Sequence, residues 1–287
     1  MATRARAVAG QVPGAFFVDT TCIDCGTCYR FAPEVFRDAG NCSSVHAQPD
    51  TNEGILHASL ALVACPTGSI GTSDKRFVAE ASRAFPLPLG DDVYFCGYTA
   101  ESSFGAWSYL IQRPQGNVLV DSPRFAEPLA ARLEALGGAA WMFLTHRDDV
   151  ADHRKWRERL GCERIIHTGD RLPGLERIVE GEAPLRLAED LLLIPTPGHT
   201  AGSQCLLYRA KVLFSGDHLW WNPPRAMLSA SRTACWFDWN TQLVSLEKLL
   251  KFDFQRVLPG HGDSYDADSA EAMNRELVKA LEWLKRR

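Results

Sequence analysis

The sequence lacks the features that mark several large classes of protein. None of its apolar runs approaches the roughly 20 residues that a membrane-spanning helix needs, so we expect no membrane partner. Basic residues do not outnumber acidic ones, and the net charge of -4 argues against a nucleic-acid partner. The N-terminal stretch MATRARAVAGQVPG has no apolar core, so we do not expect a secretory signal there.

Cysteines arranged as a disulfide framework are also missing. Of the nine cysteines, Cys96, Cys162, Cys205 and Cys235 lie one by one in apolar or aromatic surroundings, as small buried residues do. Cys42 lies alone between two cysteine motifs and is harder to interpret. This usage favours the reducing cytoplasm over a secreted setting.

The four remaining cysteines form a tight group of three and a distant fourth. Cys22, Cys25 and Cys28 make the pattern C-x-x-C-x-x-C, and Cys65 precedes a proline. This pattern is typical of a cubane iron–sulfur cluster, expected as [4Fe-4S], or as [3Fe-4S] after loss of one iron. A zinc knot is the competing interpretation, although zinc sites more often show two separated pairs. Because Ala32 stands where two-cluster proteins have a further cysteine, we expect a single cluster.

The cysteines belong to a segment whose pattern differs from the rest of the chain. We expect a disordered tail over 1–14, a cluster-binding unit over 15–80 and a linker over 81–90, where prolines and a glycine interrupt the pattern. Within the unit, FFVD predicts a first strand and APEVFRDAG a short helix with a turn. HASLALVAC predicts a helix that ends at Cys65, and SIGT an edge strand.

Residues 91–287 are predicted to form a layered α/β domain. Strand-like segments include DVYFCGY, SYLI and VLV on either side of a QRPQGN turn, WMFLT, ERIIH, LLLIPT, SQCLLYRAKVLFSG and QRVLPG. PLAARLEALGG and VADHRKWRERLG predict helices, the second with Asp148 or Asp149 available as its cap. Two amphipathic helices are expected nearer the C-terminus. Many strands with interspersed helices indicate a layered α/β fold.

Several of these apolar runs lead directly to a histidine or an aspartate. In chain order, the candidate metal ligands are His146, Asp152, His153, His199, Asp217 and His261. Side chains at successive strand ends can converge on one rim of a sheet, and imidazole with carboxylate suits zinc, iron or manganese better than magnesium or calcium. The sequence therefore predicts a two-metal centre.

The motifs around these residues resemble those of the metallo-β-lactamase-fold superfamily. PGHTAGS at 197–203 is the most specific of them, and SGD at 215–217 and PGHG at 259–262 accompany it. This resemblance covers about 91–287, while CIDCGTC and ACPTGSI are similar to single-cluster bacterial-type ferredoxins. The two together imply an αββα sandwich with metals at one edge of its sheets, preceded by a small α+β ferredoxin-like domain.

The resemblance also implies roles for the candidate ligands, with two divalent metal ions, zinc or iron, bound by the chain. The implied ligands are His146 and His199 for the first metal and Asp152, His153 and His261 for the second, with Asp217 bridging. Asp152 would also be catalytic, because it would orient a nucleophilic hydroxide activated by the metals.

The first motif departs from the family pattern H-x-H-x-D-H. It is two residues longer here and has Asp148 at the position of the second histidine. If Asp148 is a ligand, the first site is richer in oxygen and tilts towards iron or manganese. If Asp148 only caps the next helix, the first metal has a poor ligand set.

Two activities follow from these expectations. The first is hydrolysis of a small-molecule ester, thioester, lactone, amide or phosphodiester, with the cluster structural or sensing oxidation. The second is a di-iron redox enzyme that receives electrons through the cluster and from a redox partner. A degenerate scaffold is a third interpretation, which the retained histidines argue against.

Aromatic segments at 220–224 and 234–239 are candidates for an apolar pocket wall, with loop packing as the alternative. The sequence does not indicate an oligomeric state.

Overall fold

The computed structural model describes residues 2–286, which divide into two compact units. The first unit holds the residues up to Val118, Ser122–Ala140 and Ala151–Gly161. The second holds Leu119–Asp121, Trp141–Val150 and the residues from Cys162 onward. Residues 1 and 287, to which the predicted domains also extend, lie outside the described residues.

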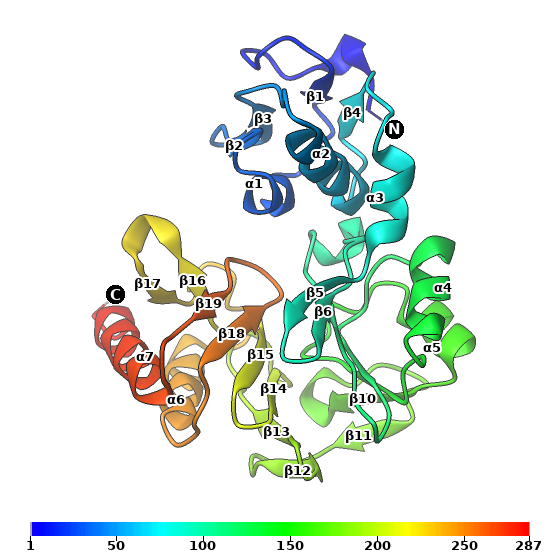
Figure 1. Ribbon diagram of the computed structural model, residues 1–287. Helices are drawn as coiled ribbons and strands as arrows, with labels where there is room; N and C mark the ends of the chain where they lie inside the picture. The colour runs from blue at the N-terminus through cyan, green and yellow to red at the C-terminus, as the bar shows by residue number, and fades with distance from the viewer. Residues whose placement is uncertain (1, 287) are drawn as a thin grey trace. The chain divides into compact units, whose positions relative to one another are not determined.

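The cysteine-bearing part of the first unit is a small α+β fold with two short antiparallel sheets (Figure 1). Its elements are β1 (Phe16–Val18), α1 (Thr27–Phe31), β2 (Phe36–Asp38), β3 (Ser43–Val45), α2 (Asn52–Ala64) and β4 (Ile70–Thr72). β1 pairs with β4, and β2 pairs with β3. Phe16, Phe36 and Ile55 are buried in one shared apolar core. The strand FFVD, the helix before Cys65 and the strand SIGT lie where the sequence predicts them.

The short helix predicted over APEVFRDAG is wrong. Strand β2 occupies this segment, and the helix of this region, α1, lies before it. Phe36 is buried in the core whereas Arg37 and Asp38 are exposed. The segment is a strand because its backbone pairs with β3, a contact that local spacing does not reveal.

Residues 2–14, for which the sequence predicts a disordered tail, make defined contacts with this fold. A 3-10 turn spans Arg4–Arg6, and Ala7 forms a β-bridge with Asp19. The Arg4 guanidinium lies 4.6 Å from the centre of the Phe17 ring, a cation–π contact. The structure differs from the prediction because these partners come from the following strand.

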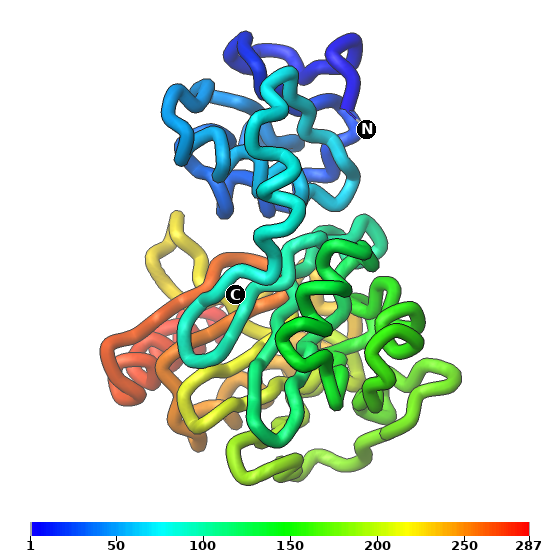
Figure 2. Tube along the Cα trace, turned by 45° about the vertical axis from the view of Figure 1, so that its right-hand side comes forward, coloured from blue at the N-terminus to red at the C-terminus, as the bar shows by residue number. Residues whose placement is uncertain are grey.

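The predicted linker over 81–90 contains regular structure. Helix α3 (Val78–Ala84) leads within three residues into β5 (Leu87–Gly90), as the continuous trace in Figure 2 shows. β5 pairs with β6 (Val93–Phe95), and β6 pairs with β7 (Tyr109–Ile111). β5 is the last strand of its sheet, so one of its sides has no neighbouring strand. Pro88 is tolerated there because an edge strand can lack a backbone N–H without losing a hydrogen bond within the sheet.

The remaining elements of the first unit include two helices. The 3-10 turn η2 (Glu101–Ser103) precedes β7. Strand β8 (Val118–Val120) follows β7; its first residue belongs to this unit and the other two to the second unit. Helix α4 (Glu127–Ala135) and helix α5 (His153–Leu160) lie further along the chain. The residue at the N-cap of α5 is Asp152, so neither Asp148 nor Asp149 caps this helix.

The second unit contains a parallel group of three strands and a six-stranded sheet. In the first group, β10 (Glu163–His167) pairs with both β9 (Trp141–Phe143) and β11 (Arg177–Val179). The six-stranded sheet has the order β12-β13-β14-β15-β18-β19 (Figure 1). Its strands are β12 (Leu185–Ala188), β13 (Leu191–Pro195), β14 (Gln204–Tyr208), β15 (Val212–Gly216), β18 (Arg256–Pro259) and β19 (Tyr265–Asp266).

Two helices pack against the six-stranded sheet. They are α6 (Trp239–Leu249) and α7 (Ala270–Leu284), and Leu246 and Leu281 share a core with Leu213 of the sheet. The hairpin β16 (Trp220–Asn222) and β17 (Met227–Ser229) completes the unit, with 3-10 turns η3 (Thr168–Asp170) and η4 (Pro223–Arg225). Within residues 2–286, no helix combines the length and apolar character that crossing a bilayer requires.

Candidate metal centre and iron–sulfur site

His146 is oriented by a chain of hydrogen bonds behind it. It follows β9, is 1% exposed, and its Nδ1 lies 2.9 Å from Thr145 Oγ1. That hydroxyl lies 3.0 Å from both carboxylate oxygens of Asp121. The hydroxyl can donate to Asp121 and accept from Nδ1–H, which leaves a lone pair on Nε2. Nε2 is buried and has no hydrogen-bond partner within residues 2–286.

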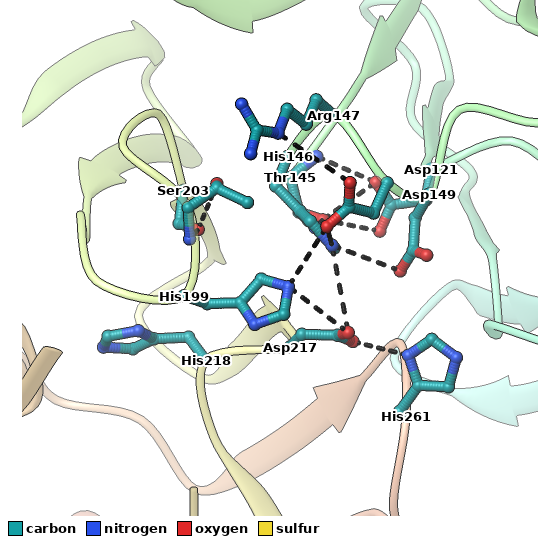
Figure 3. Close-up of polar contacts among 12 residues, drawn as sticks. Asp121, Thr145, His146, Arg147, Asp149, His199, Ser203, Asp217, His218 and His261 are labelled. Atoms are coloured by element: carbon teal, nitrogen blue, oxygen red, sulfur yellow. Dashed lines mark hydrogen bonds and ion pairs between the residues drawn. The ribbon is translucent and has the colours of Figure 1, made fainter. Parts of the chain in front are cut away.

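His199 meets His146 from a second loop. Their rings are 4.7 Å apart and nearly perpendicular, and Figure 3 shows both facing the Asp217 carboxylate. His199 lies in the turn after β13, where the backbone N–H groups of Trp236 and Phe237 donate to its carbonyl. Gly198 before it has φ +152°, and a Cβ there would lie 2.3 Å from the backbone of Gln242. This close approach explains the glycine of the PGH motif.

Asp217 links the two histidines to a third. Its Oδ2 lies 3.8 Å from His146 Nε2 and 3.7 Å from His199 Nε2. Its Oδ1 lies 2.7 Å from His261 Nδ1, which donates to it (Figure 3). Burial alone would raise the pKa of Asp217, but the neighbouring histidines, His261 first, hold that pKa below its usual range. Asp217 is therefore a carboxylate at neutral pH.

Two further carboxylates border this site. Asp148 Oδ2 lies 3.5 Å from His199 Nε2 and 3.9 Å from His146 Nε2. Asp149 Oδ2 lies 4.0 Å from His146 Nε2. The structure thus brings Asp148 to the site, and it adds Asp149, for which the sequence predicted only a possible role as a helix cap.

These side chains form two overlapping groups that could each hold a metal ion. One group is His146, Asp148 and His199, and the other is His146, Asp149 and Asp217; in each, the ligand atoms lie within 4.8 Å of one another. Both oxygens of Asp149 are buried without a hydrogen-bond partner within residues 2–286. Burial, and then the charges of Asp217 and Asp121, raise the pKa of Asp149 well above its usual range. Buried oxygens of this kind are costly unless a cation balances them, so the donor set fits a metal.

Asp170 supports the site and was not identified from the sequence. Its Oδ2 accepts from the Arg147 backbone N–H at 3.1 Å and from the Thr200 hydroxyl. Its Oδ1 accepts from the Gly202 N–H at 3.1 Å. Asp170 therefore ties the His146 loop to the His199 loop. The only signal in the sequence was an aspartate after the strand ERIIH.

The structure gives Asp152 and His153 different surroundings. Asp152 has φ +49°, and its carboxylate accepts from the Phe125 N–H at 2.8 Å and pairs with Lys155 at 2.7 Å. His153 is the first residue of α5 and is 9% exposed. Neither belongs to the two metal-capable groups, so their metal roles and the catalytic role of Asp152 stay predictions.

His218 directly follows Asp217 in the chain, but it belongs to neither metal-capable group. In Figure 3 its ring points away from the Asp217 carboxylate and the rings of His146 and His199. It is fully buried, and burial lowers its pKa to about 3. His218 is therefore a neutral interior residue near neutral pH.

The four motif cysteines converge in the first unit. Cys22, Cys25, Cys28 and Cys65 line one pocket, and Cys42 is not part of its lining. Backbone N–H groups of Ser43 and Ser69 donate to the sulfurs of Cys22 and Cys65, both at 3.3 Å. Burial raises the pKa of the Cys28 thiol to about 12, and the nearby cysteines add to this effect. Sulfurs that lie together and accept hydrogen bonds from backbone N–H groups fit an iron–sulfur cluster, which would bind them as thiolates.

The chain is similar to known proteins over part of its length. A hydroxyacylglutathione hydrolase of Rhizobium etli is 33% identical over 140 residues, which are 46% of this chain and 52% of the relative. A β-lactamase-like protein 2 homolog of Caenorhabditis elegans is 26% identical over 180 residues, 56% of this chain and 57% of that protein. This chain spans about half the length of these curated relatives.

A solved structure decides the fold. The metallo-β-lactamase of Hirschia baltica superposes with a TM-score of 0.51 at 19% identity, covering 69% of this chain and 95% of that one. The chain has the metallo-β-lactamase fold. The family model described as the 4Fe-4S single cluster domain of Ferredoxin I matches residues 18–72, so a ferredoxin-like segment precedes that fold. The predicted fold class, a metallo-β-lactamase α/β fold after a small α+β unit, is confirmed.

Proposed function

We propose that the protein is a metal-dependent hydrolase that cleaves a small-molecule thioester, with a [4Fe-4S] cluster held by Cys22, Cys25, Cys28 and Cys65. One observation carries the proposal: buried atoms of His146, His199 and Asp149 that have no hydrogen-bond partner within residues 2–286 converge beside Asp217. The preference for a thioester rests on the relatives named hydroxyacylglutathione hydrolase.

The residues of the chain prepare this site for metal. Burial lowers the pKa of His146 to about 4, so its imidazole is neutral and able to act as a ligand at neutral pH. The hydroxyl of Thr145, which also contacts Asp121, forms a hydrogen bond with Nδ1 of His146 and so orients its ring. His261 orients Asp217 in the same way, by donating a hydrogen bond to its carboxylate. Bound metal ions would supply Lewis-acid polarisation of the scissile carbonyl. We propose that Asp152, His153 and His261 complete the ligand set and that Asp152 orients the nucleophile.

The test is turnover of metal-loaded protein on matched thioester, ester and phosphodiester substrates. We expect thioester cleavage above background, and loss of at least about a hundredfold in kcat/KM for Asp217→Asn, in the range measured when groups acting on the transition state are removed. Asp266→Asn is the matched control, because Asp266 is exposed and pairs only with Arg256 in the contacts described. Equal kcat/KM values for the wild-type protein and Asp217→Asn would contradict the proposal.

A second candidate is a di-iron oxidoreductase that receives electrons through the cluster. Asp148 and Asp149 favour it, because two carboxylates beside His146 and His199 make a donor set richer in oxygen than an all-imidazole zinc site. A redox partner would then deliver electrons to the cluster, and the reducing cytoplasm would protect it.

Metal and acid-labile sulfide analysis of anaerobically purified protein separates the two candidates. About four irons with sulfide and two zincs favour the hydrolase, whereas about six irons favour the oxidoreductase, given one cubane cluster and a two-metal centre. Protein with sulfide but no metal beyond the cluster would contradict both.

A further inference from the structure

The loop Tyr98–Trp107 contacts both cysteine-bearing segments of the iron–sulfur pocket. At one end, Thr99 Oγ1 donates to the carbonyl of Ala64, the residue before Cys65, at 2.6 Å. At the other end, the Gly105 carbonyl accepts from Thr27 Oγ1 at 3.3 Å. These cysteine segments are far apart in sequence, so one loop that holds both helps to fix the pocket. The family model for the single-cluster domain ends at residue 72, before this loop begins.

Gly105 brings the loop backbone unusually close to a cluster cysteine. A Cβ at this position would lie 2.7 Å from Cys25 Cβ and 2.8 Å from Cys25 Sγ, and φ is +82°. The loop is braced in this position, because the Gly105 N–H donates to the Ala100 carbonyl at 2.9 Å and the Ala106 N–H to that of Ser103 at 2.8 Å. Only a residue without a side chain fits, and the approach shields one side of the Cys25 sulfur.

Thr27 joins the loop to the sulfur. It is buried, and its Oγ1 lies 3.6 Å from Cys25 Sγ as well as 3.3 Å from the Gly105 carbonyl. A hydroxyl has one hydrogen to donate, so the carbonyl and a Cys25 thiolate compete for it. Hydrogen bonds to the sulfurs and solvent exposure are two of the factors that set the potential of a cluster.

Trp107 holds a positive charge near the same cysteine. The Arg30 guanidinium donates to the Cys25 carbonyl at 2.9 Å and lies 5.2 Å from the centre of the Trp107 ring. Trp107 in turn stacks on Phe95 with ring centres 4.1 Å apart. A cation at this place favours the more negative, reduced cluster.

We propose that the loop Tyr98–Trp107 completes the iron–sulfur site and sets the reduction potential of the cluster. Thr27, Gly105 and Trp107 are positioning residues that act through Cys25. Gly105 limits the access of water to the Cys25 sulfur, Thr27 shares its hydroxyl hydrogen between that sulfur and the Gly105 carbonyl, and Trp107 holds the Arg30 guanidinium nearby. This inference depends on a cluster at the four cysteines and not on the hydrolase reaction, so the failure of either is visible without the other.

The first test is a redox titration of anaerobic holoprotein, followed by the EPR signal of the reduced cluster. Gly105→Ala should shift the midpoint potential and hasten cluster loss in air, because the added methyl must displace the loop from Cys25. Gly116→Ala is the matched control: its φ is +107° and its Cβ would lie 2.8 Å from Ala140 Cβ, so it is crowded too, but not against a cysteine. The control should keep the wild-type potential.

The second test covers the case in which Gly105→Ala does not fold. Trp107→Leu removes the ring beside Arg30 and leaves Gly105 in place, and Arg30→Gln removes the charge itself. Both should lower the midpoint potential, because less positive charge near Cys25 makes addition of an electron less favourable. Wild-type potentials and wild-type cluster lifetimes in the folded variants would overturn the proposal.

Discussion

Asp149 shows how one residue can serve metal binding at the expense of stability. Its oxygens are buried without a hydrogen-bond partner in the described part of the chain, next to the carboxylates of Asp217 and Asp121. A raised pKa for a buried carboxyl means that the metal-free protein loses stability as pH rises from the ordinary range of an aspartate towards the raised pKa. A bound cation would reverse this effect, because it balances the charge.

Asp149→Asn is therefore expected to separate the two roles. It should weaken metal binding by about tenfold or more, by analogy with the loss of ligand-supporting groups. It should also stabilise the metal-free protein at neutral pH by on the order of 1 kcal/mol, or roughly 2–4 °C in Tm. Metal titration and thermal unfolding measure both effects.

Asp148→Asn provides the comparison, because Asp148 is 42% exposed and has little buried charge to relieve. It should weaken metal binding without stabilising the metal-free protein. If Asp149→Asn kept full metal affinity, Asp149 would be only a buried acid.

At the scale of elements, the turn after β13 depends on the segment that leads into α6. The His199 carbonyl accepts two N–H groups from 236–237, and the Gly198 carbonyl accepts from the Asp238 N–H and the Cys235 thiol. Asp238 then caps α6 by accepting from the Thr241 N–H. The position of a metal-facing histidine is therefore fixed by the start of a helix some forty residues later.

Gly198→Ala tests this dependence. Its Cβ would meet the backbone of Gln242 at 2.3 Å, so either the turn or α6 must move. We expect a loss of roughly 2 kcal/mol in the free energy of unfolding and a large loss of metal affinity. Gly174→Ala is the control, since its φ is +74° but nothing lies within 4 Å of the added methyl. Metal affinity equal to that of Gly174→Ala would contradict the assigned role.

For the whole molecule, two buried neutral histidines make the fold sensitive to acid. Burial lowers the pKa of His146 to about 4 and that of His218 to about 3, from an ordinary value of 6.5. Below pH 6.5 the unfolded chain takes up these protons while the folded chain does not. The stability that these two neutral histidines contribute is thus fully present above about pH 6.5 and is lost as the pH drops towards 4 and then 3.

His218→Gln should reduce this acid sensitivity. The slope of unfolding free energy against pH should fall by about 1.4 kcal/mol per pH unit between pH 6 and 5, the full effect of one titrating group. Denaturant unfolding of both proteins at several pH values gives the difference and cancels any acid effect on the cluster. Parallel curves would show that His218 is not a buried neutral residue.

Local patterns predicted much of the fold and part of the site. The helix before Cys65, the helices at 127–135 and 239–249 and most strands follow from spacing that the chain carries locally. Strand β2 and the contacts of 2–14 could not be predicted, because their partners are backbone groups elsewhere in the chain. The prolines of 81–90 indicated a linker, since the sequence does not show that β5 is an edge strand.

The sequence by itself determined the motif residues: four cysteines with cluster spacing, and His146, His199, Asp217 and His261 at the ends of strand-like runs. Only the tertiary structure decided that Asp148 and Asp149 face the histidines, that Asp170 ties their loops together and that Gly105 lies against Cys25. The physical reason is that a motif records local backbone geometry, whereas the charge, burial and close contacts of a side chain depend on residues that folding brings from distant parts of the chain.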